Sequence, residues 1–329
     1  MMVGALAAFF VLFVPMGLAG WHLSRNKVLF FSGALFISLA IAVHLTPYFP
    51  SISRLLVPLP SSSPPVLSPI SCLSSIHDVF WSSQDPPSWS WSRSNPALSC
   101  GFQKLTRSDA SDLLNGSWIL VAGDSQARLL ALSVLSLILD PTAMDAVRAD
   151  LFKRHSDYHI SVPENGADLD FVWAPYELNL TETLRRIEVN ERYPDVVVMG
   201  DGLWHMLHFT SALDYGVALR DVRRSATGTG RSRHMFWLGM PTLVSAKLNT
   251  EEKRMRMNMS IWEAYEQEVN SSGLLRQFGG PFLLLDVGLL SRGCGSRCTV
   301  DGMHYDEVVY EAALHIMLNA LLIESHQRI

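Results

Sequence analysis

The chain has little charge and no excess of basic residues. Only 17% of its 329 residues are Asp, Glu, Lys or Arg, and 26 Lys and Arg against 31 Asp and Glu leave a formal net charge of -5. A protein that binds nucleic acid mainly through its phosphates needs the opposite balance, so we exclude nucleic acid as a partner. The 48% of hydrophobic residues excludes disorder along the whole chain. This high content of hydrophobic residues, with so few charged ones, predicts that part of the chain lies in lipid.

Charge is absent altogether from the first 21 residues. A second uncharged run covers Val28–Val43, and Arg25 and Lys27 lie between the two runs. Each run is close to the shortest length that spans a bilayer as a helix. If the loop with Arg25 and Lys27 is cytosolic, as the positive-inside rule requires, everything after the second run is lumenal. We therefore predict a membrane anchor of two helices over residues 1–45; one long anchor or a cleaved first segment is the alternative.

Cysteine is scarce, and all of it follows the predicted anchor. The four cysteines are Cys72, Cys100, Cys294 and Cys298. Their even number favours two disulfides formed in an oxidising compartment, because the wide spacing of Cys72 and Cys100 does not suit the close ligand pairs of a zinc site. Three pairings are possible, and the most local one joins Cys72 to Cys100 and Cys294 to Cys298. We predict no metal site.

Four Asn-x-Ser/Thr sequons also suit a lumenal location. They begin at Asn115, Asn179, Asn258 and Asn270. Such a sequon accepts glycan only in the secretory pathway, so we expect glycosylation here if this part of the chain is lumenal.

The segment that follows the anchor, residues 46–111, is not expected to form a core of its own. It begins as a Ser- and Pro-rich stem, and Trp81, Trp89 and Trp91 then precede Cys100. Clustered tryptophans in this context either stack on sugar rings or wrap over the core, where a disulfide holds them. We favour the wrap.

From residue 112 to residue 329, short apolar runs alternate with amphipathic segments. The runs predict strands at 118–122, 170–174, 195–199, 235–238 and 282–287. The segments between and after them predict helices at 125–139, 182–189, 203–224, 251–278 and 306–324. Five such strand–helix units are typical of a parallel sheet covered by helices on both faces. We predict a three-layer α/β/α fold over residues 112–329, with the site at the carboxyl ends of the strands.

The first predicted strand runs directly into Gly123, Asp124 and Ser125, where a helix begins. A Ser at such a turn exposes its hydroxyl, and its backbone N–H lies at the positive end of the helix, where it can bind an oxyanion. Gly123 allows the tight turn. Alone these three common residues are a weak signal, because Asp124 or Ser125 could simply cap the helix.

An acid and a histidine follow the last predicted strand. Asp301 precedes His304 by three residues, just before the final predicted helix. Asp301 can orient and polarise the imidazole of His304, which can then take the proton of Ser125. The pattern Asp-x-x-His is common by itself. Its combination with Ser125 at the other end of one α/β domain predicts nucleophilic catalysis by Ser125, His304 and Asp301.

Together these motifs resemble those of the SGNH, or GDSL, hydrolase superfamily. The residues that carry this resemblance are Gly123-Asp124-Ser125, Arg128 and Asp301-x-x-His304. More narrowly, Trp89-x-Trp91 followed by Cys100-x-Phe102 is similar to plant cell-wall polysaccharide O-acetyltransferases of the trichome-birefringence-like group. Gly202-Leu-Trp204-His205 is similar to the lumenal domain of sialate and capsule O-acetyltransferases. The chain most resembles a plant altered-xyloglucan group, intermediate between these two, that shares the N-terminal hydrophobic pair.

The resemblance implies an SGNH-like domain behind transmembrane segments, anchored in the Golgi membrane with the catalytic part in the lumen. It implies O-acetylation of a polysaccharide such as xyloglucan or xylan through an acetyl-Ser125 intermediate. It implies no bound cofactor, with acetyl-CoA or a relayed acetyl group as the acetyl donor. The implied partners are a multispanning membrane protein that supplies acetyl groups and other wall acetyltransferases. The alternatives are a carbohydrate acetylesterase and a non-catalytic glycan-binding or scaffold protein.

One departure from the superfamily concerns the oxyanion hole, to which its third block supplies an Asn side chain. Here the corresponding stretch contains Gly200, Asp201 and Gly202 but no Asn. A carboxylate cannot donate to an oxyanion unless it is protonated, so we expect the backbone N–H of Gly200 or Gly202 to act with that of Ser125. Alternatively, Asp201 is only a helix cap.

Three further residues lie near these motifs. Arg128, one helical turn after Ser125, can contact the substrate or pair with Asp124. His205 and His208 are three residues apart on one predicted helix. No carboxylate motif accompanies them, so we favour packing or a place in the wall of a site over metal binding.

Overall fold

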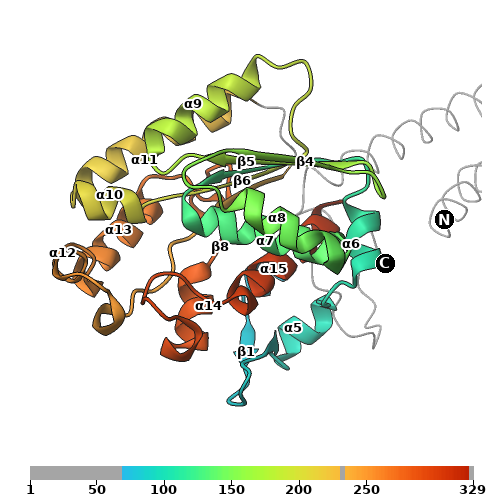
Figure 1. Cartoon of the computed structure of the whole chain (residues 1–329), viewed down its shortest axis with the longest axis horizontal. Coiled ribbons are helices and arrows are strands. Elements are labelled where there is room, and N and C mark those ends of the chain that lie inside the picture. Colours follow the sequence, from blue (N-terminus) through green and yellow to red (C-terminus); the bar gives the residue numbers. More distant parts are fainter. Residues whose placement is uncertain (1–68, 230–233, 326–329) are drawn as a thin grey trace, which may run out of the picture. The chain divides into compact units, whose positions relative to one another are not determined.

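The computed structural model describes residues 69–229 and 234–325 (Figure 1). The predicted anchor lies outside these residues. The strands of the described part are β1 Val79–Trp81, β2 Trp89–Trp91, β3 Trp118–Gly123, β4 Tyr158–Val162, β5 Ala167–Trp173, β6 Val196–Gly200, β7 His234–Leu238 and β8 Leu283–Leu285. The helices are α4 Pro69–Ser75, α5 Asn95–Cys100, α6 Arg107–Leu113, α7 Ser125–Ile138, α8 Met144–Leu151, α9 Glu177–Glu188, α10 Leu203–His208, α11 Ala212–Thr229, α12 Glu251–Arg256, α13 Met259–Ser271, α14 Val287–Cys294 and α15 Glu307–Ser325.

The main sheet has the strand order β4-β5-β3-β6-β7-β8. The pairs from β5 to β8 are parallel, and β4 joins β5 at the edge as an antiparallel strand. The chain moves from β3 to β5 on one side and then returns to β6 on the other side. This reversal of direction between β3 and β6 is the topological switch point at which open α/β sheets bind their ligands.

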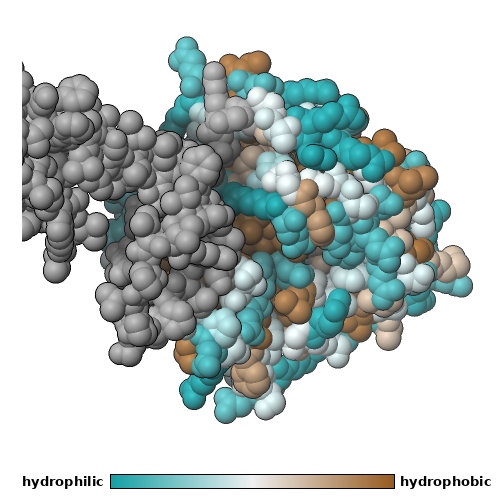
Figure 2. All heavy atoms as spheres, turned by 180° about the vertical axis from the view of Figure 1, so that it is seen from behind, coloured by the Kyte–Doolittle hydropathy of each residue, from teal (hydrophilic) through white to brown (hydrophobic). Residues whose placement is uncertain are grey.

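Helices cover both faces of this sheet, which confirms the predicted three-layer α/β/α fold (Figure 1). Along β3, Ile119 and Val121 pack into the core under α7 and α15, whereas Leu120 and Ala122 pack into the core under α9 and α11. Burial on both faces explains why β3 and β6 are continuous apolar runs instead of alternating ones. On the surface seen in Figure 2, small groups of hydrophobic residues lie among hydrophilic ones.

Helix α15 is a core helix. Within the described residues it alone has the length and apolar composition of a membrane span, but 72% of its most apolar window is buried inside the protein. It packs against α7 and α14, and its hydropathy is therefore explained by the domain interior.

The tryptophan-rich segment before the domain packs on the same core, as the predicted wrap requires. A disulfide joins Cys72 in α4 to Cys100 in α5. Trp89 is only 3% exposed, and its ring lies 5.8 Å from that of His315 in α15. The predicted domain start at residue 112 falls inside α6, whose Ala110 is buried in this core.

Several local features differ from the prediction. Strand β4 was not expected, because its exposed edge position leaves no continuous apolar run. The expected helix at 203–224 is interrupted around Thr210, which has a left-handed φ of 56°. The expected helix at 251–278 is divided by Asn258, whose side chain caps α13. Val287 begins α14 instead of ending a strand, because the side chain of Asp286 caps that helix.

Candidate active site

Ser125 is the first residue of α7 and lies directly behind β3, at the switch point of the sheet. Asp124 caps the helix, and its Oδ1 accepts the N–H of Gln126 at 2.8 Å. A Cβ atom on Gly123 would lie 2.1 Å from the carbonyl oxygen of Gly200, its partner across the β3–β6 pair. Any side chain at position 123 would therefore push the two strands apart and displace Ser125.

The three predicted catalytic side chains form one chain of hydrogen bonds. Ser125 Oγ lies 2.7 Å from His304 Nε2, although 179 residues separate them in the sequence. His304 Nδ1 lies 2.7 Å from Asp301 Oδ2. When Nδ1 carries the ring proton, it donates to Asp301, and Nε2 is free to accept the proton of Ser125. This is the geometry that a general base needs to activate a serine hydroxyl.

Asp301 is arranged to stay ionised. Partial burial alone would raise its pKa, but hydrogen bonds from the His304 ring and from the backbone N–H groups of His304 and Met303 lower the pKa well below the ordinary value. The two N–H groups lie 2.8 and 3.0 Å from Oδ1. The carboxylate can therefore stabilise an imidazolium on His304 without taking up a proton itself.

The loop that carries Asp301 and His304 is fixed by its own hydrogen bonds. Thr299 Oγ1 donates to the carbonyl oxygen of His304 at 2.7 Å and accepts the N–H of Gly302 at 3.0 Å. Lys247 Nζ donates to the carbonyl oxygen of Thr299 at 2.7 Å. The disulfide between Cys294 and Cys298, predicted as the local pairing, closes the turn just before this loop.

Gln126 is a site residue that the sequence analysis did not single out. Its Nε2 donates to the carbonyl oxygen of Met303 at 3.1 Å, and its Oε1 accepts a short hydrogen bond from the hydroxyl of Tyr310. Gln126 is 4% exposed, so this link between α7 and the His304 loop is shielded from water. Its position directly after Ser125 was the only available signal.

The stretch from Gly200 to Gly202 does not form a side-chain cap. Gly202 is the N-cap residue of α10, with a φ of 116°, and a Cβ there would lie 2.6 Å from Met240 Sδ. Asp201 therefore does not cap the helix, which corrects that interpretation. Its Oδ1 instead accepts the hydroxyl of Tyr215 at 3.1 Å, on the side of the sheet covered by α11.

Asp201 belongs to a group of buried carboxyls at the ends of three neighbouring strands. Burial raises the pKa of Asp201 well above its ordinary value, and the negative charges of Glu177 and Asp124 raise it further. Burial likewise raises the pKa of Glu177 to about 7 and that of Asp124 to about 6. The raised pKa favours the protonated form of Asp201, in which a carboxyl can donate a hydrogen bond.

Arg128 is almost entirely buried and forms no ion pair within the described residues. Its guanidinium lies 4.7 Å from the ring centre of Trp173 and 5.2 Å from that of Phe171, so it packs between α7 and β5. Burial lowers its pKa, although the nearby Asp124 opposes this. The expected close pair between Arg128 and Asp124 is therefore not present. The Arg128 guanidinium packs against aromatic rings instead.

His205 and His208 have different neighbours. His205 is buried, and its Nδ1 lies 2.8 Å from the hydroxyl of Tyr265. His208 is exposed, and its Nδ1 lies 2.8 Å from the hydroxyl of Tyr176. In the described part of the chain no three His, Cys, Asp or Glu side chains are grouped so that they could hold a metal ion.

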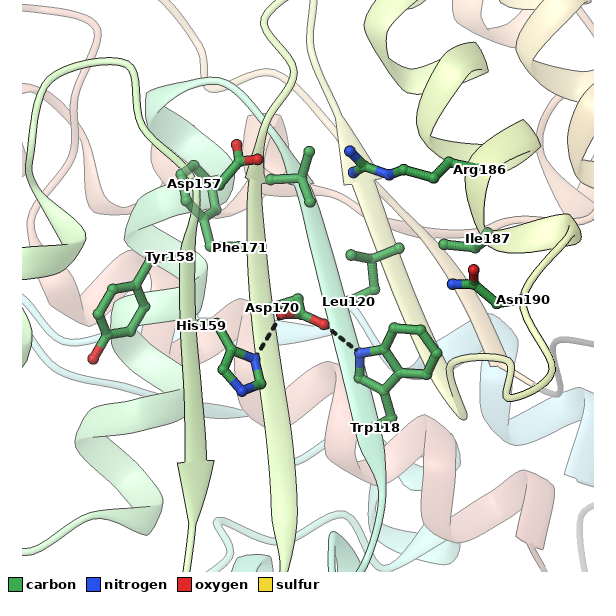
Figure 3. A pocket seen from close by; sticks show the side chains of 11 residues that line it. Trp118, Leu120, Asp157, Tyr158, His159, Asp170, Phe171, Arg186, Ile187 and Asn190 are labelled. Atoms are coloured by element: carbon green, nitrogen blue, oxygen red, sulfur yellow. Dashed lines mark hydrogen bonds and ion pairs between the residues drawn. The ribbon is translucent and has the colours of Figure 1, made fainter.

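A separate hollow of about 430 Å³ lies over β4, β5 and β3 (Figure 3). Asp170 crosses its floor, where its two carboxylate oxygens lie 2.6 Å from Trp118 Nε1 and 2.8 Å from His159 Nδ1. Asp157 lines one end of the hollow and accepts the N–H of Trp173 at 2.8 Å. None of the proposed catalytic side chains lines this hollow.

The four sequon residues differ in accessibility. Asn115 lies exposed in the turn before β3, and Asn270 lies exposed near the end of α13. Asn179 is half-buried in α9. Asn258 uses both ends of its amide, because Oδ1 accepts the N–H of Ile261 at 3.1 Å and Nδ2 donates to the carbonyl oxygen of Met255 at 2.9 Å.

The fold and the hydrogen-bonded Ser125, His304 and Asp301 have the arrangement of a serine-type acyltransferase or esterase. The chain is 51% identical over 360 residues to Protein ALTERED XYLOGLUCAN 9 of Arabidopsis thaliana, and the alignment covers 98% of each protein. The chain therefore belongs to the altered-xyloglucan family of plant proteins. No family model matches the chain.

Solved structures that are similar to the chain are distant in sequence. A Slackia heliotrinireducens protein assigned to the SGNH hydrolases has a TM-score of 0.38 and 15% identity over 62% of this chain and 98% of its own. A catalytic mutant of Axe2, an acetylxylan esterase from Geobacillus stearothermophilus, has a TM-score of 0.37 and 13% identity over 67% of this chain and 96% of its own.

Proposed function

We propose that this protein transfers acetyl groups to hydroxyls of a cell-wall polysaccharide, with xyloglucan or xylan as the acceptor. The observation that carries the proposal is the hydrogen-bonded chain from Ser125 through His304 to Asp301, which supplies a nucleophile, a base and an orienting carboxylate. The name of the 51% identical relative refers to xyloglucan, which supports a polysaccharide acceptor.

In the first half of the reaction Ser125 Oγ attacks the carbonyl carbon of the acetyl donor, and His304 Nε2 takes the hydroxyl proton. The tetrahedral intermediate then collapses, and the bond between the acetyl carbon and the leaving atom of the donor breaks. His304 returns its proton to that leaving group. Ser125 is left as an acetyl ester, and Asp301 remains ionised throughout.

In the second half a sugar hydroxyl takes the place of the leaving group. His304 Nε2 removes the proton of this hydroxyl as its oxygen attacks the acetyl carbon of the ester. The bond from that carbon to Ser125 Oγ breaks, and His304 returns the proton to Oγ. The products are an O-acetylated sugar and the free enzyme.

The oxyanion of both tetrahedral intermediates needs donors at the edge of the sheet. The N–H of Ser125 lies at the start of α7, where the first N–H groups of a helix have no acceptor within the helix. Gly202 begins α10 after the neighbouring strand and offers a second backbone N–H. Asp201 is bonded to Tyr215, so we assign the hole to backbone groups, with the Gly200 N–H as the alternative second donor.

We place this reaction in the Golgi lumen, at the membrane. The two disulfides and the exposed sequons at Asn115 and Asn270 support an oxidising, glycosylating compartment. The acetyl group would come from acetyl-CoA, or be relayed from it, through a multispanning membrane protein. Other wall acetyltransferases would be further partners.

A second candidate is a carbohydrate acetylesterase. The side chains of His304 and Asp301 are 38% and 37% exposed, so water can reach the acetyl-serine as well as a sugar can. Transfer and hydrolysis share the first half-reaction and differ only in the acceptor. The ratio of acetylated glycan to free acetate therefore separates these two candidates.

The decisive experiment is intact-mass analysis of the protein after incubation with acetyl donors. We expect an added acetyl group that peptide mapping places on Ser125 and that a glycan acceptor removes. Ser125→Ala should carry no adduct, whereas Ser99→Ala, which changes an exposed serine in α5, should behave as the parent. An adduct that persists in Ser125→Ala would contradict the mechanism. If Ser125→Ala still restored wall acetylation in a plant that lacks the protein, the scaffold alternative would replace it.

A further inference from the structure

A group of aromatic rings lies at the carboxyl edge of the sheet beside Ser125. We call it the aromatic platform, and its members are His155, Trp173, Tyr176, Trp204, His208 and Phe209. They come from four places in the chain: the segment after α8, the end of β5, the residue before α9, and α10 with the residue after it. None of them contributes to the hydrogen bonds of Ser125, His304 and Asp301.

One half of the platform is built around Trp173. The ring of His155 stacks on it at 4.8 Å between centres and an angle of 16°. Trp204 stands edge-on to both, 5.6 Å from Trp173 at 85° and 5.2 Å from His155 at 82°. The rings thus form a corner with two nearly perpendicular walls.

The other half of the platform continues from Trp204 toward solvent. Tyr176 lies 6.2 Å from Trp204 at 88°, and its hydroxyl is held 2.8 Å from His208 Nδ1. Phe209 packs 5.8 Å from Tyr176 and is 63% exposed. Part of the Phe209 ring is therefore open to solvent and accessible to a ligand.

The backbone around the platform is held in an unusual conformation. His155, with φ 53°, and Thr210, with φ 56°, are the non-glycine residues that adopt a left-handed φ in the described part of the chain. Both adjoin this surface, because His155 belongs to it and Thr210 follows Phe209. Such conformations cost free energy and are typically retained at binding and catalytic sites.

The strand register places the platform next to Ser125. Gly123, two residues before Ser125, pairs with Trp173 in β5 on one side and with Gly200 in β6 on the other. Trp204 follows Gly200 by four residues. The loop of His304 lies over the β7 end instead, because the N–H of Val244 donates to the carbonyl oxygen of Gly302 at 2.8 Å. The platform therefore lies on the side of Ser125 that faces β5, and the His304 loop lies on the opposite side.

We infer that the aromatic platform binds the sugar rings of the polysaccharide acceptor, an inference that rests on the proposed function. A sugar ring has apolar C–H groups on its faces and hydroxyls around its edge, so it can lie on an aromatic ring and hydrogen-bond to polar groups beside it. His155 and His208, both exposed, carry ring nitrogens of this kind, although His208 Nδ1 already bonds to the Tyr176 hydroxyl. No member is Lys or Arg, and the guanidinium of Arg128, which lies 4.7 Å from the ring centre of Trp173, is almost entirely buried. This favours a neutral sugar over an acidic one.

The hollow of Figure 3 lies near the platform, although no platform residue lines it. Asp157, at one end of the hollow, binds the backbone N–H of Trp173 and follows His155 by two residues. Trp118, Arg186 and Asn190 line the remainder (Figure 3). A glycan chain that extends from the platform past Asp157 would meet these hydrogen-bonding side chains.

The test measures binding without turnover, in the full-length protein that carries Ser125→Ala. The probes are a xyloglucan-derived oligosaccharide, a xylan-derived oligosaccharide and an oligogalacturonate, titrated by calorimetry. Trp204→Ala removes one wall, and His155→Asn removes one ring but keeps a residue that tolerates a left-handed φ. Trp204→Phe tests whether a smaller ring restores binding. Phe80→Ala is the matched control, because Phe80 is an exposed ring in β1, outside the platform.

We expect a neutral oligosaccharide to bind, and Trp204→Ala and His155→Asn each to weaken it about tenfold. Trp204→Phe should retain most of the affinity, and Phe80→Ala should match the parent. Equal affinity in all variants, or binding of the acidic probe alone, overturns the inference. The proposed function fails in a different experiment, if unaltered protein that binds glycan forms no acetyl adduct on Ser125.

Discussion

Gln126 Nε2 donates a hydrogen bond of 3.1 Å to the carbonyl oxygen of Met303, the residue before His304. Gln126 is also the residue after Ser125, so one buried side chain ties the nucleophile's helix to the loop of its base. Tyr310 in α15 completes this link by donating to Gln126 Oε1. The distance between Ser125 and His304 is thus set by a third residue that does not touch the reacting atoms.

We predict that Gln126 is a positioning residue. Gln126→Met keeps the approximate size of the side chain but removes both the donor to Met303 and the acceptor for Tyr310, so it should slow acetylation of Ser125 about tenfold or more. The loss of these buried hydrogen bonds should cost about 1–3 kcal/mol of unfolding free energy. Rapid-quench mass analysis and urea unfolding measure the two effects. A drop in stability with an unchanged acetylation rate would show that the link is only structural.

The three side chains of the proposed catalytic chain should differ in their effects. Ser125→Ala should abolish the adduct yet cost at most about 1 kcal/mol of stability, because Asp124 and not Ser125 caps α7. His304→Ala should be nearly as damaging, because a serine without a base is a poor nucleophile at neutral pH. Asp301→Asn should be milder than either. Single-turnover acetylation rates rank the three variants, and a full rate in His304→Ala would exclude His304 as the base.

The buried carboxyls predict that stability falls as pH rises. In the unfolded chain Asp and Glu lose their protons near pH 4, whereas in the folded chain the pKa of Asp124 is about 6 and that of Glu177 about 7. The folded state thus binds more protons between these values, and unfolding becomes easier from about pH 4 to pH 7. Asp301 acts in the opposite direction, because its lowered pKa adds stability that is lost only below about pH 4.

Asp201→Asn tests this dependence, because it replaces a buried carboxyl whose pKa is raised by a neutral group of the same shape. Urea unfolding at pH 5.5 and pH 8 should show a smaller difference than in the parent. The control is Asp112→Asn, which changes an exposed aspartate. Asp201→Ala removes any side-chain donor at this position, so its activity at pH 7 should largely remain if backbone groups form the oxyanion hole. A complete loss of activity in Asp201→Ala would assign that role to Asp201.

Reduction of the disulfide between Cys294 and Cys298 should lower activity more than stability. The bridge closes a loop of only a few residues, so its effect on chain entropy is about 2 kcal/mol or less. It lies three residues before Asp301, and its loss should loosen the loop that carries Asp301 and His304. Cys294→Ala/Cys298→Ala should therefore show a larger fold-loss in acetylation rate than in the unfolding equilibrium constant. Equal fold-losses in acetylation rate and in the unfolding equilibrium constant would show that the bridge only stabilises the domain as a whole.

Glycan should attach at Asn115 and Asn270 if the chain is made in the secretory pathway. Both are exposed, whereas the amide of Asn258 is already bonded as the cap of α13. Peptide mapping after endoglycosidase treatment should find most of the occupancy at these two positions. Unchanged gel mobility after the treatment, with four reactive thiols, would contradict a lumenal location.

The sequence alone identified the parts of this protein that depend on local pattern. The apolar runs at 118–122 and 195–199 predict buried strands because both faces of a central parallel strand are covered. Gly123, Asp124 and Ser125 were visible because a strand-to-helix turn restricts which residues fit. Asp301 and His304 were visible because three residues separate an acid from the histidine it orients.

Only the tertiary structure decided which of these parts meet and what surrounds them. Ser125 and His304 come together because the ends of parallel strands share one edge of the sheet, a relationship that sequence separation does not reveal. The pKa of Asp201 is raised by burial and by the charge of Glu177, which lies on another element. The sequence did not indicate that Trp173 and Trp204 meet beside Ser125, which follows from the strand register. These three features depend on contacts between residues far apart in the sequence. Such contacts produce no periodic pattern of residues from which they could be predicted.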